Sequence, residues 1–249
     1  MKEHPILFSA PMVRAILEGR KTQTRRIVRL PKGAEVDGHG ENKTALFCSR
    51  SNQPTGTSVV RCPFGSAGDR LWVRETWGDA DGYYQDHENE VPFVTCYRAD
   101  LSALSHTVPP KPVPAWDIKS WNWSKQKWRP SIHMPRWASR LLLDVVSVRV
   151  ERLQDITEED AKAEGVESPD TEREEHDWSI CEQCGGTLLY AGFDANLGAI
   201  FDCDCTRCDT HRKRFRNFWK RINGERADWE SNPWVWRVEF HRTESQQFP

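Results

Sequence analysis

The 249-residue chain lacks several features that would assign it to a common functional class. No apolar run reaches the roughly 18 residues that a membrane-spanning helix needs. The first residues, MKEHPILFSAPMV, hold no long apolar stretch of the kind found in signal peptides. Neither G-x-G-x-x-G nor G-x-x-x-x-G-K-[ST] occurs, which argues against dinucleotide binding and P-loop chemistry. We therefore expect a cytoplasmic protein that makes no membrane contact.

The chain also has little net charge, because 35 Lys and Arg stand against 37 Asp and Glu, for a formal charge of −2. This balance argues against a protein coated uniformly with basic residues. The two signs are segregated, however: residues 14–32 and 211–226 are rich in Lys and Arg, whereas residues 151–177 are rich in acids. Such a molecule can present a basic face to phosphate groups while staying nearly neutral. The alternative is that the basic runs are solvated helix faces.

Tryptophan is abundant, with 12 residues in the chain. Its large apolar ring and single N–H suit a hydrophobic core, an interface or a base-stacking site. We expect most of these side chains to lie in the core, as aromatic residues usually do.

Hydrophobic patterning predicts an α+β protein with several strands, few helices and long loops. In the predicted strand within residues 68–77, Leu71, Val73 and Glu75 share one face, and Trp72, Arg74 and Thr76 share the other. We expect loops at residues 33–66 and 105–135. Further strands are predicted at residues 6–10, 20–30, 92–97, 141–153 and 234–242.

Three helices are predicted from end signals and apolar stripes. Pro11 fits the first turn of a short helix that ends at Gly19, and Thr157 fits the N-cap of another that ends at Gly165. The third helix, within residues 211–222, carries one apolar stripe made of Phe215, Phe218, Trp219 and Ile222.

Five of the 8 cysteines lie close together near the C-terminal third of the chain. Two C-x-x-C pairs, separated by a spacer of about 20 residues, match a structural zinc ribbon. We assign the ligands as Cys181, Cys184, Cys205 and Cys208, and Cys203 and His211 remain alternative ligands. Four thiolates leave no open coordination position, so the zinc is expected to be structural and to position the basic helix. The scattered Cys48, Cys62 and Cys96 fit a reducing compartment.

Several motifs resemble one known family. Gly19, Lys21, Thr24 and Arg26 fit the pattern G-x-K-x-x-[TE]-x-R. Together with GDRLWVRETW (68–77), ITEEDAKAEGV (156–166) and INGERADWESNPWVWRVEF (222–240), they resemble the ASCH family, a relative of PUA domains, in its bacteriophage and prophage forms. The resemblance covers residues 5–30, 65–80, 128–166 and 211–242.

This resemblance implies a PUA-like β-barrel with short flanking helices, long loops and a cleft lined by the G-x-K motif. The barrel domain would comprise residues 1–166 and 209–249, and a zinc-ribbon-like insertion would comprise residues 178–210. For a phage-encoded protein, the expected location is the cytoplasm of the bacterial host.

The resemblance also implies three functions. The first is binding of RNA, DNA or a modified base in the cleft around Lys21. The second is deacylation of N4-acetylcytidine, because amidohydrolases of this family use residues that match Lys21, Thr24 and Glu164. A Lys21 amine of lowered pKa would deprotonate Thr24 or a water, and Glu164 would orient the nucleophile or protonate the leaving amine. The third is ribonuclease activity. The expected ligand-binding residues are Arg20, Arg25, Arg26, Trp72, Arg74, Glu75 and Trp77.

Overall fold

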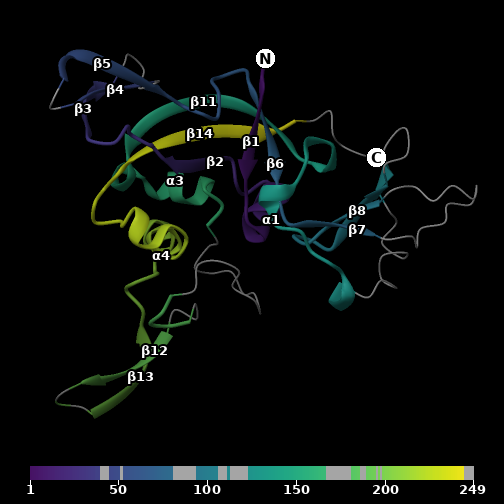
Figure 1. Ribbon diagram of the computed structural model, residues 1–249. Helices are drawn as coiled ribbons and strands as arrows, with labels where there is room; N and C mark the ends of the chain where they lie inside the picture. Colours follow the sequence, from purple (N-terminus) through teal and green to yellow (C-terminus); the bar gives the residue numbers. More distant parts are fainter. Residues whose placement is uncertain are drawn as a thin grey trace, which may run out of the picture. The chain divides into compact units, whose positions relative to one another are not determined.

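The computed structural model has a mixed α+β fold, with many strands and few helices (Figure 1). The predicted class is thereby confirmed. The structure describes residues 1–39, 45–50, 53–80, 94–105, 111–112, 123–166, 181–185, 189–194, 196 and 198–243. The chain divides into two compact units. The first comprises Met1–Glu18, Pro63–Val146 and Phe240–Pro249, and the second comprises Gly19–Cys62 and Ser147–Glu239.

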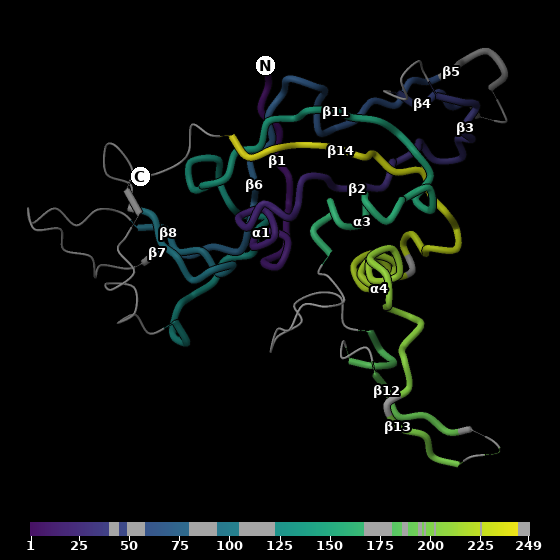
Figure 2. Tube along the Cα trace, turned by 180° about the vertical axis from the view of Figure 1, so that it is seen from behind, coloured from purple at the N-terminus to yellow at the C-terminus, as the bar shows by residue number. Residues whose placement is uncertain are grey.

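The largest sheet has five strands in the order β1-β6-β11-β14-β2. In the first unit, β1 (Glu3–Leu7) runs parallel to β6 (Arg70–Arg74), and β6 pairs antiparallel with the start of β11 (Leu142–Arg152). In the second unit, β2 (Gln23–Ile27) pairs antiparallel with β14 (Trp234–Arg242). The long strands β11 and β14 contribute residues to both units and run side by side in both views (Figures 1 and 2).

The expected closed barrel is not present among the described strands. Closure requires every strand to pair on both sides, whereas the order of this sheet begins at β1 and ends at β2. The other strands of the described chain form separate sheets of two to four strands. The predicted strand content is therefore present, but the largest sheet is open.

The segment 33–66, predicted to be a loop, instead contains a three-stranded antiparallel sheet. Its strands are β3 (Ala34–His39), β4 (Ala45–Arg50) and β5 (Gln53–Arg61), in that order. Leu46 and Cys48 alternate with their neighbours along β4 and are 0% and 1% exposed. This short alternation stabilises a strand in a stretch whose composition resembles a loop, so the prediction was wrong.

The first unit also holds a four-stranded antiparallel sheet in the order β10-β9-β8-β7. Its strands are β7 (Trp77–Ala80), β8 (Val94–Tyr97), β9 (Ser102–Ser105) and β10 (Lys111–Pro112). Short 3-10 helices follow at Trp123–Lys125, Ser131–His133 and Arg136–Ala138. Of the predicted loop at 105–135, residues 106–110 and 113–122 lie outside the described residues. The predicted first helix is confirmed as α1 (Ala10–Leu17), with Met12, Val13 and Ile16 buried.

The second unit contains the helices α3 (Glu158–Ala163) and α4 (His211–Asn223) and the hairpin of β12 (Leu189–Asp194) and β13 (Gly198–Asp204). The Thr157 hydroxyl caps α3 by accepting a hydrogen bond from the backbone N–H of Asp160, as predicted. Short 3-10 helices lie at Leu153–Asp155 and Gly224–Arg226.

The predicted stripe of α4 is confirmed for three of its four residues. Phe215, Phe218 and Trp219 are buried, whereas Ile222 in the last turn is 48% exposed. In the part of the chain that the structure describes, no helix has the length and apolar character to cross a bilayer.

Candidate functional site

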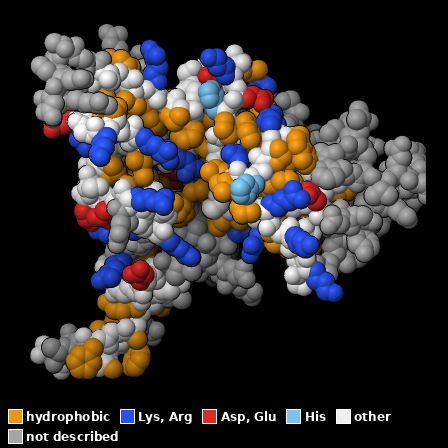
Figure 3. Space-filling view, viewed as in Figure 1, with side chains coloured by type: hydrophobic (Ala, Val, Ile, Leu, Met, Phe, Trp, Pro, Cys, Tyr) orange, Lys and Arg blue, Asp and Glu red, His pale blue; other side chains and the backbone are white. Residues whose placement is uncertain are grey.

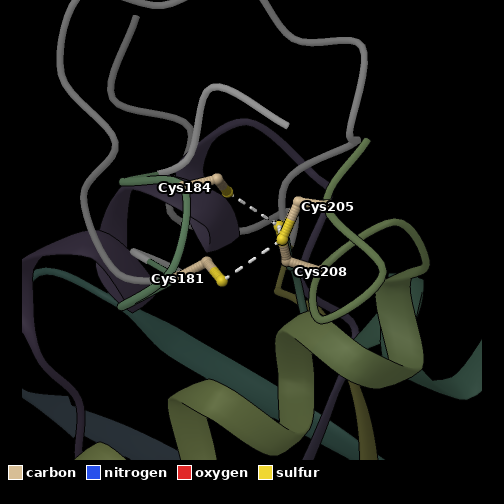
Figure 4. A group of neighbouring side chains, drawn as sticks. All are labelled: Cys181, Cys184, Cys205 and Cys208. Carbon is tan, nitrogen blue, oxygen red and sulfur yellow. Dashed lines mark hydrogen bonds between the residues drawn. The ribbon is translucent and has the colours of Figure 1, made fainter. Parts of the chain in front are cut away.

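The four cysteines assigned as metal ligands gather in the second unit, as the spacing predicts. Cys181, Cys184, Cys205 and Cys208 are buried, and their Sγ atoms all lie within 4.8 Å of one another (Figure 4). The Sγ–Sγ distances are 3.7 Å for Cys181–Cys205, 3.2 Å for Cys184–Cys208 and 3.7 Å for Cys205–Cys208. These values exceed the ~2.05 Å of a disulfide bond, and all four cysteines are free thiols.

This geometry fits a tetrahedral metal ion. Ligand sulfurs about 2.3 Å from a central Zn²⁺ would lie ~3.8 Å from one another, which is close to the distances observed. Burial, together with hydrogen bonds to neighbouring sulfurs, raises the pKa of the Cys208 thiol. A cation among the sulfurs would reverse this effect by favouring the thiolates. The four residues can therefore hold a structural metal ion and leave no position open for a substrate.

The two alternative ligands have other surroundings. Cys203 lies in β13 opposite Tyr190, is partly exposed, and its Sγ is 3.9 Å from the carbonyl oxygen of Phe201. The ring Nδ1 of His211 lies 2.8 Å from a carboxylate oxygen of Glu158. Neither residue belongs to the four-sulfur cluster.

The cysteine cluster is joined to the start of α4. Arg214, which is 1% exposed, donates a hydrogen bond from Nε to the carbonyl oxygen of Cys208 at 2.8 Å. Asn217 donates from Nδ2 to the carbonyl oxygen of Arg207 at 3.2 Å. A metal bound by the cysteines would therefore fix the loop that precedes α4 and the first turns of that helix.

A hollow of about 420 Å³ lies between the cysteine loop and α4. Lys and Arg side chains gather over this helix in the surface view (Figure 3). The wall of the hollow carries three cations, one amide, one acid and one cysteine of the four-sulfur cluster. Its lining residues are Cys181, Glu182, Arg207, Asn217, Lys220 and Arg221. Sequence reasoning identified the basic helix but missed Arg207, whose position inside the second C-x-x-C pair is the available signal.

The predicted catalytic residues Lys21 and Glu164 lie together in the second unit. Lys21 Nζ donates to Glu164 Oε2, to the Glu164 carbonyl oxygen and to the Gln23 carbonyl oxygen, each at 2.8 Å. These contacts use the three donors of the ammonium group. The two side chains are 0% and 2% exposed, so both are enclosed by protein. Burial lowers the pKa of Lys21, although the charge of Glu164 opposes that effect.

A network of buried charges surrounds this pair. The Arg25 guanidinium contacts Glu151 at 2.7 Å, Asp160 at 2.9 Å and Glu164 at 3.2 Å. Arg237 contacts Asp160 at 2.8 Å, and its Nε donates to the Gln23 side-chain oxygen at 2.6 Å. Arg25, expected to bind ligand, is thus fully engaged within the protein. Sequence reasoning missed Gln23, Glu151, Asp160 and Arg237 as members of this network.

Thr24, the third predicted catalytic residue, is 1% exposed and lies opposite Val238 in the β2–β14 pairing. The side chains of Gln23 and Arg25 both reach Asp160. Because side chains alternate along a strand, Thr24 lies on the opposite face of β2.

The remaining predicted ligand-binding residues occupy both units. In the second, Arg20 donates to the Gly165 carbonyl oxygen at 2.8 Å, and burial lowers the pKa of Arg26. In the first, the Arg74 guanidinium lies 5.5 Å from the centre of the Trp72 ring and donates to the Ile132 carbonyl oxygen.

Glu75 and Trp77, also in the first unit, are both buried. Glu75 accepts two hydrogen bonds from Arg140, each at 2.9 Å. Trp77 is 2% exposed and meets the Trp137 ring edge-on, with 5.8 Å between the ring centres. Glu75 therefore has an internal partner, and Trp77 presents almost no surface to a base.

Comparisons with protein-family models, with curated proteins and with solved structures found no match for this chain. The ASCH resemblance therefore stays a prediction.

Proposed function

We propose that this protein binds a nucleic acid and that the cysteine loop and α4 hold its phosphate backbone. The hollow of about 420 Å³ beside the cysteine cluster carries this proposal. Arg207, Lys220 and Arg221 contribute cationic groups to its wall, and Asn217 contributes an amide. Such donors suit the oxygens of a phosphodiester, and phosphate contacts supply much of the affinity of nucleic-acid binding.

The proposal includes a structural zinc ion held by Cys181, Cys184, Cys205 and Cys208. Sulfur ligands at tetrahedral spacing favour zinc over harder cations such as magnesium or calcium. The residues joined by the metal would position Arg207 in the loop and Lys220 and Arg221 on the helix. Zinc would therefore act through the folding of this surface.

The proposal also retains the ASCH resemblance, with its PUA-like fold and a base-recognition site at Lys21. The support is the short distance between Lys21 and Glu164, two residues of separate motifs that the resemblance pairs. Because both side chains are enclosed, a base would reach them only after the surrounding segment opened.

Fluorescence anisotropy with a fluorescein-labelled RNA oligonucleotide tests the α4 surface. The dissociation constant of the wild type should rise steeply with KCl, because bound phosphates release counterions. The double variant Lys220→Glu/Arg221→Glu should bind at least tenfold more weakly, with a shallower salt dependence.

Lys32→Glu, which reverses an exposed charge elsewhere in the same unit, is the control and should keep wild-type affinity. Circular dichroism verifies that all three proteins are folded. The proposal would be rejected if the dissociation constant of the wild type did not change with KCl, or if the double variant kept wild-type affinity.

The second candidate function is deacylation of an N4-acylated cytidine. Lys21 Nζ lies 2.8 Å from Glu164 Oε2, and burial lowers the pKa of that lysine, as a general base requires. Because Thr24 lies on the other face of β2, water is the better candidate nucleophile. In its neutral form the Lys21 amine would take a proton from the water as the water oxygen bonds to the acyl carbon. That proton would pass through Glu164 to the leaving nitrogen as the acyl carbon–nitrogen bond breaks, giving cytidine and the carboxylic acid.

Chromatography of N4-acetylcytidine incubated with the protein would detect cytidine. The Lys21→Ala variant is the negative control. Absence of cytidine with the wild type would exclude this activity. Equal amounts of cytidine with the variant would reject Lys21 as its general base.

A further inference from the structure

A second surface with binding character lies in the first unit, in a segment that contains no acidic residue. Residues 118–143 include no Asp or Glu, although Asp117 and Asp144 flank them. The segment alternates cations and tryptophans, and its described part, 123–143, contains Lys125, Lys127, Arg129, Arg136, Arg140, Trp123, Trp128 and Trp137. An interleaved pattern of this kind is typical of surfaces that bind single strands.

The exposed side chains of this segment include an aromatic ring on which a base can stack and cations that can contact phosphates. The Trp137 side chain is 53% exposed, which is unusual for so large an apolar ring. Lys125, Lys127, Arg129 and His133 are exposed as well. We call these five residues the Trp137 platform.

Trp77 brings the indole and a cation of the platform together. The buried Trp77 ring meets Trp137 edge-on, with 5.8 Å between ring centres, and the Arg129 guanidinium lies 4.9 Å from the centre of the same ring. The backbones of Trp77 and Arg129 also exchange hydrogen bonds of 2.7 and 3.2 Å. The exposed indole and the cation are therefore both held against one rigid core residue.

The part of the segment that carries the lysines is anchored too. Trp123 and Trp128 are stacked, with ring centres 5.9 Å apart and planes 6° apart, and they pack against a buried cluster that includes Val94 and Cys96. The Gln126 amide donates to the carbonyl oxygen of Asp79 at 3.0 Å. An anchored surface loses little conformational entropy on binding, which favours affinity.

Four acids contact cations of this segment, and two of them, Glu75 and Asp100, pair with Arg140, which is largely buried and is not part of the platform. Asp79 pairs with Arg129 at 2.5 Å, and Glu3 pairs with Arg136 at 2.7 Å. The Arg129 side chain nevertheless remains 55% exposed, so its charge still faces solvent. With Lys125 and Lys127 added, the platform has a positive character that complements a polyanion.

We propose that the Trp137 platform binds single-stranded nucleic acid. An unpaired base stacks on the exposed indole of Trp137, and the adjoining phosphates contact Arg129, Lys125 and Lys127. A duplex does not satisfy this geometry, because its bases are stacked on one another and have no free face for the indole. The platform uses residues of the first unit only, so it is independent of the α4 surface proposed above.

Anisotropy with fluorescein-labelled dT12, and with the same strand in a duplex, tests the platform. Wild type should bind dT12 more tightly than the duplex. Trp137→Ala should weaken dT12 binding at least about five-fold, the loss expected for one stacked base, and Trp137→Phe should restore most of it. Ile132→Ala is the matched control, because it removes an equally exposed apolar side chain, 56% exposed, from the same segment.

A second pair of variants tests the cations. Lys125→Glu/Lys127→Glu should make the salt dependence of dT12 binding shallower, because each lost phosphate contact lowers the slope by ~0.7 for a single strand. Lys2→Glu, an exposed lysine elsewhere in the first unit, should leave the slope unchanged.

The outcomes separate this surface from the α4 surface. If Lys220→Glu/Arg221→Glu weakens binding and Trp137→Ala does not, the platform is rejected and the α4 proposal stands. If Trp137→Ala weakens binding and Lys220→Glu/Arg221→Glu does not, the α4 proposal is rejected and the platform stands. Equal losses for dT12 and duplex would overturn stacking on an unpaired base. Sedimentation that shows Trp137→Ala converting a dimer into a monomer would identify the platform as a contact between copies and overturn the proposal.

Discussion

Lys21 Nζ lies 2.8 Å from Glu164 Oε2, and Glu164 Oε1 in turn lies 3.2 Å from Arg25. Glu164 therefore contacts two buried cations, Lys21 and Arg25. Removing one member of a buried ion pair costs about 3–5 kcal/mol, because the other charge stays in a medium that solvates it poorly. We predict that Glu164→Leu lowers the free energy of unfolding by about that amount, measured by urea denaturation.

Lys21→Met should cost less, about 1–3 kcal/mol, since Glu164 keeps its contact with Arg25. The double variant should cost less than the sum of the two single changes, because each single change strands a charge that the double change removes. Lys32→Met, at an exposed site, is the control and should have almost no effect. Strict additivity would show that the pair is not coupled.

The cysteine cluster predicts a clear difference between two adjacent cysteines. Cys205→Ser should abolish stoichiometric zinc, whereas Cys203→Ser should leave it intact, because only the Cys205 sulfur belongs to the cluster. Elemental analysis of the purified proteins measures this. Cys205→Ser should also melt at a lower temperature, since the binding energy of a structural metal contributes to folding. Equal zinc in both variants would contradict the assigned ligand set.

Features governed by local signals were the ones that the sequence predicted well. The run from Leu142 to Arg152 is apolar and β-branched enough to specify a strand by itself, and Thr157 with the acids after it specifies the start of α3. The clustering of Cys181, Cys184, Cys205 and Cys208 also followed from local spacing, because each C-x-x-C pair can present two sulfurs to one side of an ion.

Features governed by distant pairing were not predictable in the same way. The network around Lys21 exists because β2 pairs with β14, which brings Arg237 to Gln23 from 214 positions away. Nothing in the neighbourhood of either residue encodes that partnership. The open sheet was missed for the same reason, since closure depends on which strands meet at its two ends. The β3–β5 sheet was missed because glycine and polar residues masked the alternation at Leu46 and Cys48.

The contacts of Glu158 with the start of α4 should stabilise the protein to an extent that depends on pH. Its carboxylate accepts hydrogen bonds from the backbone N–H groups of His211 at 2.6 Å and Arg212 at 3.0 Å. Burial acts to raise the pKa of Glu158, but these hydrogen bonds outweigh it, and the pKa is lowered from 4.5. A lowered carboxyl pKa means that the stabilisation is complete above the ordinary value and is lost as the pH falls below it.

Glu158→Gln should therefore lower the free energy of unfolding at pH 7 by about 1 kcal/mol, a modest value because the side chain is 37% exposed and screened by solvent. The difference from wild type should shrink as the pH falls below 4.5, in denaturation curves recorded across that range. Glu159→Gln changes an exposed neighbour in the same helical turn and should show neither effect. A difference that grows in acid would have the wrong sign for this explanation.

A substitution at Gly78 in β7 tests how tightly the segment of the Trp137 platform packs against its sheet. A Cβ atom at this position would lie 2.7 Å from the carbonyl oxygen of Lys127 and 2.6 Å from the Gln126 side chain. The side chain can move, but the carbonyl belongs to backbone that the Trp77–Arg129 hydrogen bonds hold in place. Gly78→Ala should thus lower stability by about 1–3 kcal/mol, as overpacking does, and should weaken dT12 binding by displacing Lys127.

Gly38→Ala is the matched control in a strand, with no atom within 4 Å of the added carbon, and should stay within about 0.5 kcal/mol of wild type. Thermal melting and the anisotropy assay measure the two effects, and a Gly78→Ala variant as stable as Gly38→Ala would show that the segment can move away from β7.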